Sequence, residues 1–162
     1  MAFRICMVCL GNICRSPMAA AVLRHKLATA GLGDEVVVES AGTGGWHVGD
    51  GADRRARAAL VARGYDDAHA ARKFARAFFD DYDLVIAMDV DNLRNLRALA
   101  PDAQTRDEIR LLRSYDPAAP EGAVVEDPYY GGDDGFAEVL DQIERACDGL
   151  VAELVAELKA TG

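Results

Sequence analysis

The sequence predicts an α/β fold of three layers, in which a four-stranded parallel sheet lies between helices. Short apolar runs alternate with longer segments of helical character, and this alternation is typical of a parallel sheet covered on both faces. The first run, 3–9 (FRICMVC), is almost wholly apolar, as expected of a strand buried on both sides. A turn with several polar side chains follows it, at the edge where such sheets bind ligands.

Three further strands are expected after the first. Residues 35–40 (EVVVES) are rich in β-branched side chains, which favour strands. Residues 83–88 (DLVIAM) form a compact apolar run, and residues 109–112 (IRLL) form a shorter one. Each run is short and bounded by polar or glycine-containing segments, which favours a strand over a helix.

Four helices are expected between and after these strands. The first follows the turn, with Ser16 as its N-cap and Pro17 as its first residue. Residues 52–63 and 91–99 are expected to form two more, each ended by a glycine or proline. The last is an amphipathic helix, because apolar residues recur at three- and four-residue steps from 136 to 158.

A long loop is expected between the last strand and the last helix. Residues 114–135 contain prolines and glycines throughout, and loops of this length are uncommon and often functional. No repeat, low-complexity tract or linker divides the chain. We therefore expect residues 1–162 to form a single domain.

The composition argues against several classes of function. A formal net charge of -9 opposes non-specific binding to nucleic acid or to an anionic membrane. No apolar run approaches the roughly 20 residues that a membrane span needs, and the N-terminal segment lacks the pattern of a secretory signal peptide. A cytoplasmic protein is therefore expected, in which the four cysteines stay reduced.

Residues 9–16 (CLGNICRS) combine a nucleophile with groups that bind an anion. Gly11 and Asn12 adopt left-handed backbone conformations more easily than other residues, which allows successive N–H groups to face one anion. The positive end of the following helix and the guanidinium of Arg15 add to the attraction. In this field the thiol of Cys9 is expected to ionise readily. One loop after the first strand thus predicts both a phosphate-binding cradle and a thiolate nucleophile.

The motif C-x5-R-S directly after the first strand resembles that of the low-molecular-weight protein tyrosine phosphatases of bacterial type. GNICRSPMAA is highly specific for this family, D-P-Y-Y at 127–130 resembles its partner motif, and the resemblance covers the whole chain. It implies that Cys9 is the nucleophile, Arg15 binds the phosphate and Asp127 is the general acid. It also implies hydrolysis of tyrosine-phosphorylated proteins and small aryl phosphates through a phospho-cysteine, inhibition by phosphate and vanadate, and no cofactor or metal.

The resemblance also assigns roles to residues around these three. Gly45 departs from the family pattern, because relatives often carry an acidic residue there, and this departure concerns the rim of the pocket rather than its chemistry. A supporting hydrogen-bond network is expected from Asn12, Ser16, Ser40 and His69. The substrate-binding residues are expected to be Leu10, Gly11, Asn12, Ile13, Cys14, Ser16, Trp46, Tyr129 and Tyr130.

Three other functions are compatible with parts of this pattern. An arsenate reductase of this fold needs a resolving cysteine pair well down the chain, and no cysteine lies between Cys14 and Cys147. A phosphoarginine phosphatase typically carries threonine at the position of Ile13, whose apolar side chain favours an aromatic phosphoester. A non-enzymatic anion-binding module has no use for Cys9 together with Asp127. A phosphotyrosine phosphatase is therefore the leading hypothesis.

Other residues have a structural interpretation. For Cys14, packing and a redox partnership with Cys9 are both left open. Asp89 is expected to cap a helix rather than to act in catalysis. The arginine run that includes Arg55 is expected to form a solvated helix face. The three histidines are scattered and no second C-x-x-C is present, which argues against a zinc site.

Overall fold

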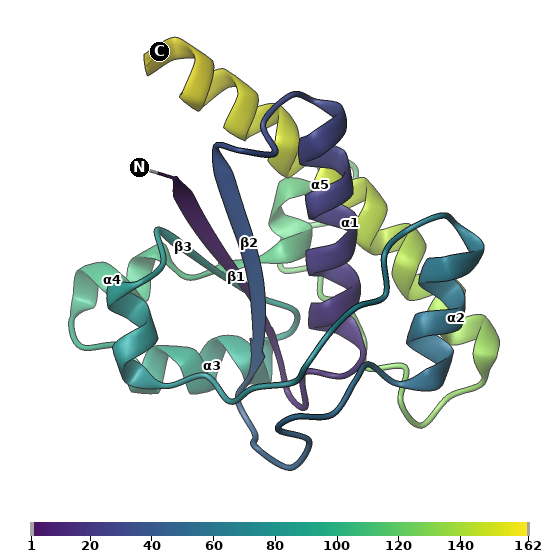
Figure 1. The fold of residues 1–162 in the computed structure, drawn as a ribbon. Helices are drawn as coiled ribbons and strands as arrows, with labels where there is room; N and C mark the ends of the chain where they lie inside the picture. Colours follow the sequence, from purple (N-terminus) through teal and green to yellow (C-terminus); the bar gives the residue numbers. More distant parts are fainter. Residues whose placement is uncertain (1, 162) are drawn as a thin grey trace.

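The computed structural model describes residues 2–161, and in it a parallel sheet lies between two helical layers (Figure 1). The order of the strands in the sheet is β2-β1-β3-β4, and every pairing is parallel. The predicted fold class is thus confirmed, although the last two strands are shorter than expected. The strands are β1 (Phe3–Cys9), β2 (Val36–Gly42), β3 (Leu84–Ala87) and β4 (Arg110–Leu111).

Helices cover both faces of the sheet (Figure 1). One face carries α1 (Arg15–Thr29), α2 (Arg54–Ala62) and α5 (Asp133–Thr161), and the other carries α3 (Val90–Leu99) and α4 (Ala103–Glu108). Two 3-10 turns, η1 (Arg76–Asp80) and η2 (Leu112–Tyr115), lie before β3 and after β4. The sequence patterns did not predict α4 or these two turns, because each is too short to show a hydrophobic period.

The two helices nearest the carboxyl edge of the sheet begin differently. At the start of α3, Asp89 and Asn92 form a reciprocal capping box, as the cap interpretation of Asp89 predicts. The predicted start of α1 is wrong, because α1 begins at Arg15 and the preceding Cys14 provides no side-chain cap. Ser16, the expected N-cap, uses its hydroxyl within the loop instead. The first N–H groups of α1 are therefore left without a side-chain acceptor.

β1 is a central strand, and its two faces belong to different hydrophobic layers. Side chains alternate across a strand, so Ile5 and Met7 pack with α1 and α5, whereas Cys6 and Val8 pack with the opposite layer. All four side chains are completely buried. Burial on both faces explains why this strand is a continuous apolar run. In Cys6, burial also raises the pKa of the thiol to about 12, which suits an inert core residue.

The strand order opens a crevice at the carboxyl edge of the sheet. The chain leaves β1 toward α1 on one face, and it leaves β3 toward α3 on the other. Neighbouring parallel strands whose connections diverge in this way form a ligand site between their ends. The ends are held together here, because the N–H of Met88 donates to the carbonyl of Val8 at 3.2 Å.

α5 is the longest helix, and its amphipathic character is as predicted. Its apolar residues from Phe136 to Leu154 join the core formed with α1 and the sheet. None of the helices within residues 2–161 has both the length and the apolar character needed to cross a membrane. Gly149 marks the closest approach of α5 to η2, since a Cβ atom there would overlap the carbonyl oxygen of Tyr115.

Replacing Gly149 with alanine should therefore destabilise the protein by about 1–3 kcal/mol, because the new methyl group forces α5 and η2 apart. Urea denaturation measures the change in the free energy of unfolding. Gly135→Ala in the same helix is the matched control, since its Cβ would meet Pro128 Cβ at 3.7 Å, an ordinary contact, and alanine favours the helix. Equal stability of the two variants would contradict this account of the packing.

Candidate active site

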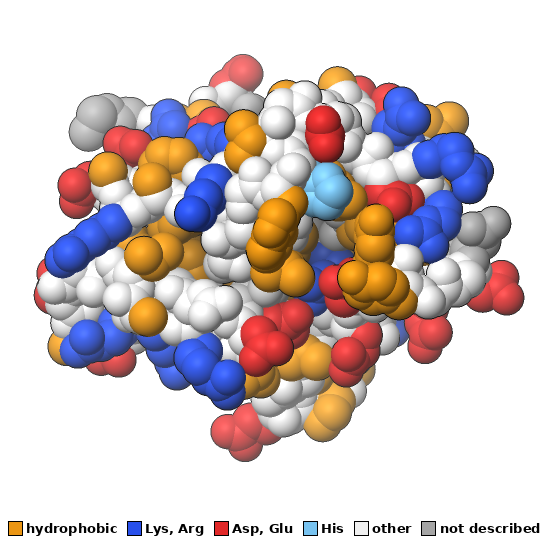
Figure 2. Space-filling model, turned by 90° about the horizontal axis from the view of Figure 1, so that it is seen from below, with side chains coloured by type: hydrophobic (Ala, Val, Ile, Leu, Met, Phe, Trp, Pro, Cys, Tyr) orange, Lys and Arg blue, Asp and Glu red, His pale blue; other side chains and the backbone are white. Residues whose placement is uncertain are grey.

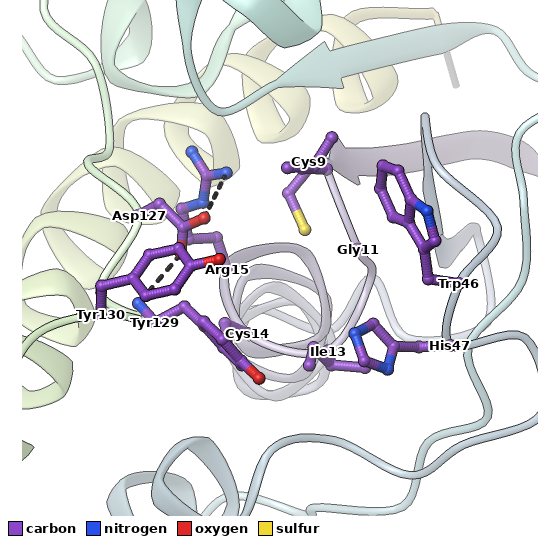
Figure 3. Close-up of a pocket in the computed structure, with 11 residues that line it drawn as sticks. Cys9, Gly11, Ile13, Cys14, Arg15, Trp46, His47, Asp127, Tyr129 and Tyr130 are labelled. Atoms are coloured by element: carbon purple, nitrogen blue, oxygen red, sulfur yellow. Dashed lines mark hydrogen bonds and ion pairs between the residues drawn. The ribbon is translucent and has the colours of Figure 1, made fainter.

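The loop between β1 and α1 borders a pocket of about 290 Å³ (Figures 2 and 3). Asn12 adopts the predicted left-handed conformation, with φ of 57°. Gly11 does not; a Cβ there would lie 3.3 Å from His47 Cδ2, so glycine serves this close approach instead. Across residues 10–14, no backbone N–H donates to an acceptor within the described chain. Unpaired N–H groups are rare in folded proteins, and these are available to an anion.

Cys9 ends β1, and its sulfur atom points into the pocket (Figure 3). Ser16 Oγ lies 3.0 Å from Cys9 Sγ. The same oxygen accepts a hydrogen bond from Asn12 Nδ2 at 2.7 Å, so its own hydrogen is free to point elsewhere. Among the described residues, the only other acceptor near this hydroxyl is the carbonyl of Ala41, which is more distant at 3.4 Å. The Ser16 hydroxyl is therefore placed to donate to a thiolate at Cys9.

Asn12 joins the loop to the rest of the fold. Its Nδ2 donates to Ser40 Oγ at 3.0 Å, and its Oδ1 accepts from the Arg72 N–H at 3.0 Å. Its carbonyl lies 2.6 Å from His69 Nε2. Burial lowers the pKa of His69, and the charges of Arg24 and Arg72 act in the same direction. A neutral imidazole that donates through Nε2 fits this contact. The structure thus brings the predicted network residues together and adds Arg72 to them.

Arg15 is a buried cation with several partners. Its Nη1 donates to Asp89 Oδ2 at 2.5 Å and to the Val125 carbonyl at 3.0 Å, and its Nη2 lies 3.7 Å from Asp127 Oδ2. Burial alone would lower the pKa of Arg15, but the negative charges of Cys9, Asp89 and Asp127 outweigh it and raise the pKa. Arg15 Nε is buried and has no partner among the described residues. The guanidinium therefore stays charged and keeps donors for an anion.

Asp89 has a second contact that the sequence interpretation missed. Its Oδ1 accepts the N–H of Asn92 at 2.8 Å as the predicted helix cap, while its Oδ2 binds Arg15. Asp89 follows β3 by two residues, at the same edge of the sheet as Cys9. The sequence did contain a signal for this contact. Carboxyl ends of parallel strands meet at one edge of a sheet, so a residue just after β3 is expected to lie near the predicted phosphate-binding loop after β1.

The loop that carries Asp127 is anchored to the sheet just before that residue. The N–H of Val125 donates to the Met88 carbonyl at 2.8 Å, which ties the loop to the end of β3. Asp127 Oδ1 accepts the N–H of Tyr129 at 3.0 Å. The other carboxylate oxygen, Oδ2, faces Arg15. Asp127 is therefore oriented toward the phosphate-binding loop, as Figure 3 shows.

Arg55 anchors the other side of this loop, so the expectation of a purely solvated arginine face on α2 is wrong. Its guanidinium donates to the carbonyls of Tyr129 and Gly131 at 2.8 and 3.0 Å. The same guanidinium also donates to the carboxylate of Asp53, which is the N-cap residue of α2. The guanidinium also lies over the Phe136 ring, 4.6 Å from its centroid. Sequence alone could not separate Arg55 from its neighbours, because Tyr129, Gly131 and Phe136 lie more than 70 positions away.

The walls of the pocket are largely apolar and aromatic. Trp46 stands on one side and the two tyrosines on the other (Figure 3), and the hollow between groups of hydrophobic side chains is visible in Figure 2. Trp46 is 72% exposed and Tyr130 is 93% exposed, so both rings offer free surface to a ligand. His47 lines the pocket and was not predicted. The lining residues are Cys9, Leu10, Gly11, Ile13, Cys14, Arg15, Trp46, His47, Asp127, Tyr129 and Tyr130.

Cys14 also borders the pocket, but its environment differs from that of Cys9. Burial raises the pKa of the Cys14 thiol, and the nearby charges of Asp53, Cys9 and Asp127 act in the same direction. Its side chain packs in the main hydrophobic core. Packing is thus the better supported of the two roles left open. Within residues 2–161, no three His, Cys, Asp or Glu side chains gather as ligands of one metal ion.

Known proteins share both the sequence and the fold of this chain. A family model described as low molecular weight phosphotyrosine protein phosphatase matches residues 4–160. A Streptomyces coelicolor protein named low molecular weight protein-tyrosine-phosphatase is 55% identical over 153 residues, covering 94% of this chain and 93% of that protein.

Solved structures agree with this match. The crystal structure of a protein tyrosine phosphatase from Entamoeba histolytica, with Hepes in its active site, has a TM-score of 0.91 at 35% identity and covers 96% of this chain and 99% of its own. That of a Drosophila arginine phosphatase has a TM-score of 0.85 at 34% identity and covers 92% and 96%. The chain therefore belongs to the low molecular weight phosphotyrosine protein phosphatase family.

Proposed function

We propose that this protein-tyrosine phosphatase hydrolyses phosphotyrosine through a phospho-cysteine at Cys9, with Arg15 as the phosphate-binding cation and Asp127 as the general acid and base. One observation carries the proposal. The Cys9 sulfur, a loop of unpaired N–H groups, the Arg15 guanidinium and the Asp127 carboxyl all border one pocket. A nucleophile, an oxyanion site and a proton donor are the three parts that phosphoester cleavage needs.

In the first step, Cys9 Sγ attacks the phosphorus atom and the bond from phosphorus to the tyrosine oxygen breaks. The N–H groups of residues 10–14 and the remaining donors of Arg15 bind the phosphoryl oxygens and stabilise their charge. The leaving phenol has a pKa of about 10, so its departure at neutral pH requires a proton. Asp127 supplies it, because its carboxyl group borders the same pocket as the Cys9 sulfur.

In the second step, water attacks the phosphorus atom of the phospho-cysteine. Asp127, now ionised, takes a proton from that water, and the bond from phosphorus to Cys9 Sγ breaks. The hydroxyl of Ser16, 3.0 Å from the sulfur, stabilises the departing thiolate. Inorganic phosphate leaves, and the thiolate is ready for another cycle.

An aromatic phosphoester fits the pocket best. A phenyl ring entering the pocket meets Trp46 on one side and Tyr129 on the other, and the apolar side chain of Ile13 borders the same space. Aromatic pairs favour such arrangements. Phosphoarginine is the second candidate, because two structural neighbours are named arginine phosphatases. The ratio of kcat/KM for a phosphotyrosine peptide and a phosphoarginine peptide distinguishes the two.

The same proposal extends to inhibitors, partners and domain organisation. Phosphate and vanadate should compete with substrate, because they need the N–H groups and guanidinium that bind the phosphoryl group. The substrates are tyrosine-phosphorylated proteins, and the net charge of -9 disfavours nucleic acid as a partner. We further propose that residues 1–162 act as one catalytic domain that needs no metal or cofactor.

Cys9→Ser should abolish turnover while leaving phosphate binding in place. A serine hydroxyl is a far weaker nucleophile than a thiolate, so kcat should fall by more than about a thousandfold. The loop N–H groups and Arg15 remain, so vanadate or phosphate should still bind, as measured by calorimetry. Phosphatase activity close to the wild-type value would rule out the covalent route.

Asp127→Asn should affect substrates according to their leaving groups. Phenyl phosphate releases a phenol of pKa about 10, so its hydrolysis should slow strongly without a proton donor. p-Nitrophenyl phosphate releases a much more acidic phenol and should slow far less. Steady-state kcat values for the two substrates give the comparison. An equal loss for both would mean that Asp127 is not the general acid.

The pKa of His69 should make stability fall as the pH decreases. Because the folded protein lowers this pKa, the unfolded chain binds more protons below a pH of about 6.5. The stability contributed by neutral His69 is therefore fully present above that pH and is lost as the pH falls from there through the lower pKa of the folded state. His69→Gln keeps a donor but does not titrate. Urea denaturation at pH 7.5 and 5.5 should show a smaller loss for this variant, and identical pH dependence would contradict the assignment.

A further inference from the structure

A second groove, of about 670 Å³, lies on the other side of the loop that carries Trp46. We propose that this groove binds an acidic segment of the substrate protein next to its phosphotyrosine. The proposal rests on the proposed function and adds to it a class of preferred substrate. The residues used in the argument are Thr43, Lys73, Phe74, Arg76, Asn95 and Leu99, all of which line the groove.

The groove is fixed relative to the catalytic pocket by backbone hydrogen bonds. Lys73 forms a parallel bridge with Gly42 at the end of β2, and the N–H of Phe74 donates to the Gly42 carbonyl at 2.7 Å. Thr43, which follows Gly42 in the chain, donates its N–H to the carbonyl of Cys9 at 2.9 Å. One short backbone path thus connects the floor of the groove to the nucleophile. The pocket and the groove are therefore held in a fixed position relative to each other by residues 42–43.

Two cations of the groove have no carboxylate partner. Lys73 and Arg76 are exposed, and neither forms an ion pair with any side chain that the structure describes. On the same face, Figure 2 shows basic side chains beside hydrophobic ones to the left of the central hollow. Together these groups complement a segment that carries both negative charge and apolar side chains.

The opposite rim of the catalytic pocket has the opposite charge. Asp89 and Asp127 lie around Arg15, and the exposed Glu126 directly precedes Asp127. Acidic side chains also line the lower edge of the hollow in Figure 2. An acidic segment is repelled from this rim and attracted toward the groove. The two rims together therefore favour one direction for the bound substrate.

Gly45 keeps Lys73 available. A Cβ atom at Gly45 would lie 3.3 Å from Lys73 Cδ, so the side chain of residue 45 would contact the lysine stem. Glycine offers no carboxylate at this point, and Lys73 stays unpaired. An acidic side chain at position 45 would neutralise the lysine and close the groove to a negative partner. Gly45 also directly precedes Trp46 in the wall of the catalytic pocket.

Peptide kinetics test the proposal. The substrates are a phosphotyrosine peptide with glutamates on only one side of the phosphotyrosine and the matched peptide with glutamines, in two sets that place the glutamates before or after the phosphotyrosine. In one of the two sets, wild-type enzyme should prefer the acidic peptide by about tenfold in kcat/KM at low ionic strength, since each exposed ion pair contributes only modestly. Added salt should reduce this preference. The double variant Lys73→Gln/Arg76→Gln should reduce it to less than about twofold, while hydrolysis of phenyl phosphate stays unchanged.

The double variant Arg54→Gln/Arg57→Gln is the matched control, because it also removes two positive charges, from exposed positions on α2, on the other face of the sheet from α3. This variant should keep the wild-type preference. A second test uses Gly45: Gly45→Asp should lower the preference and Gly45→Asn should not. Equal use of both peptides by wild type, or an unchanged preference in the double variant, would overturn the proposal. Failure of the proposed function would show separately, as absence of phenyl phosphate hydrolysis by wild-type enzyme.

Discussion

The buried charge of Arg15 is the interaction on which the site depends. Its Nη1 alone binds Asp89 and the Val125 carbonyl, which are 74 and 110 positions away along the chain. A buried cation must be paired and hydrogen-bonded to be tolerated. The ends of β1 and β3 and the start of the loop carrying Asp127 therefore have to meet around it. The requirement to satisfy one guanidinium brings together segments that otherwise belong to different faces of the sheet.

The nucleophile and the acid are positioned by different means. The loop after Cys9 is held from within by Asn12, whose amide and carbonyl groups contact Ser16, Ser40, Arg72 and His69. This network forces a left-handed residue into the loop and leaves the neighbouring N–H groups without acceptors. Asp127 has no such local network. Its orientation comes from anchors on either side, supplied by the sheet and by α2.

Local patterns were sufficient to predict the fold class and the residues of the phosphate-binding loop. An apolar run such as 3–9 has one plausible place in an α/β fold, and the loop motif lies within eight residues. Predictions failed where a side chain had a partner that its residue type and local pattern do not indicate. Ser16 is a good N-cap by its residue type, but Cys9 and Asn12 occupy its hydroxyl. Arg55 resembles its exposed neighbours, because nothing near it in the sequence indicates the carbonyls of residues 129 and 131.

The double anchoring of the loop that carries Asp127 has a consequence for how the enzyme meets its substrates. Many enzymes close a lid after binding, and the closure both excludes water and selects the substrate. Here the loop is hydrogen-bonded to the end of β3 on one side and to α2 on the other. Encounter with a phosphoprotein then requires no closing motion of this segment. Discrimination between substrates is left to surfaces that already exist around the mouth of the pocket.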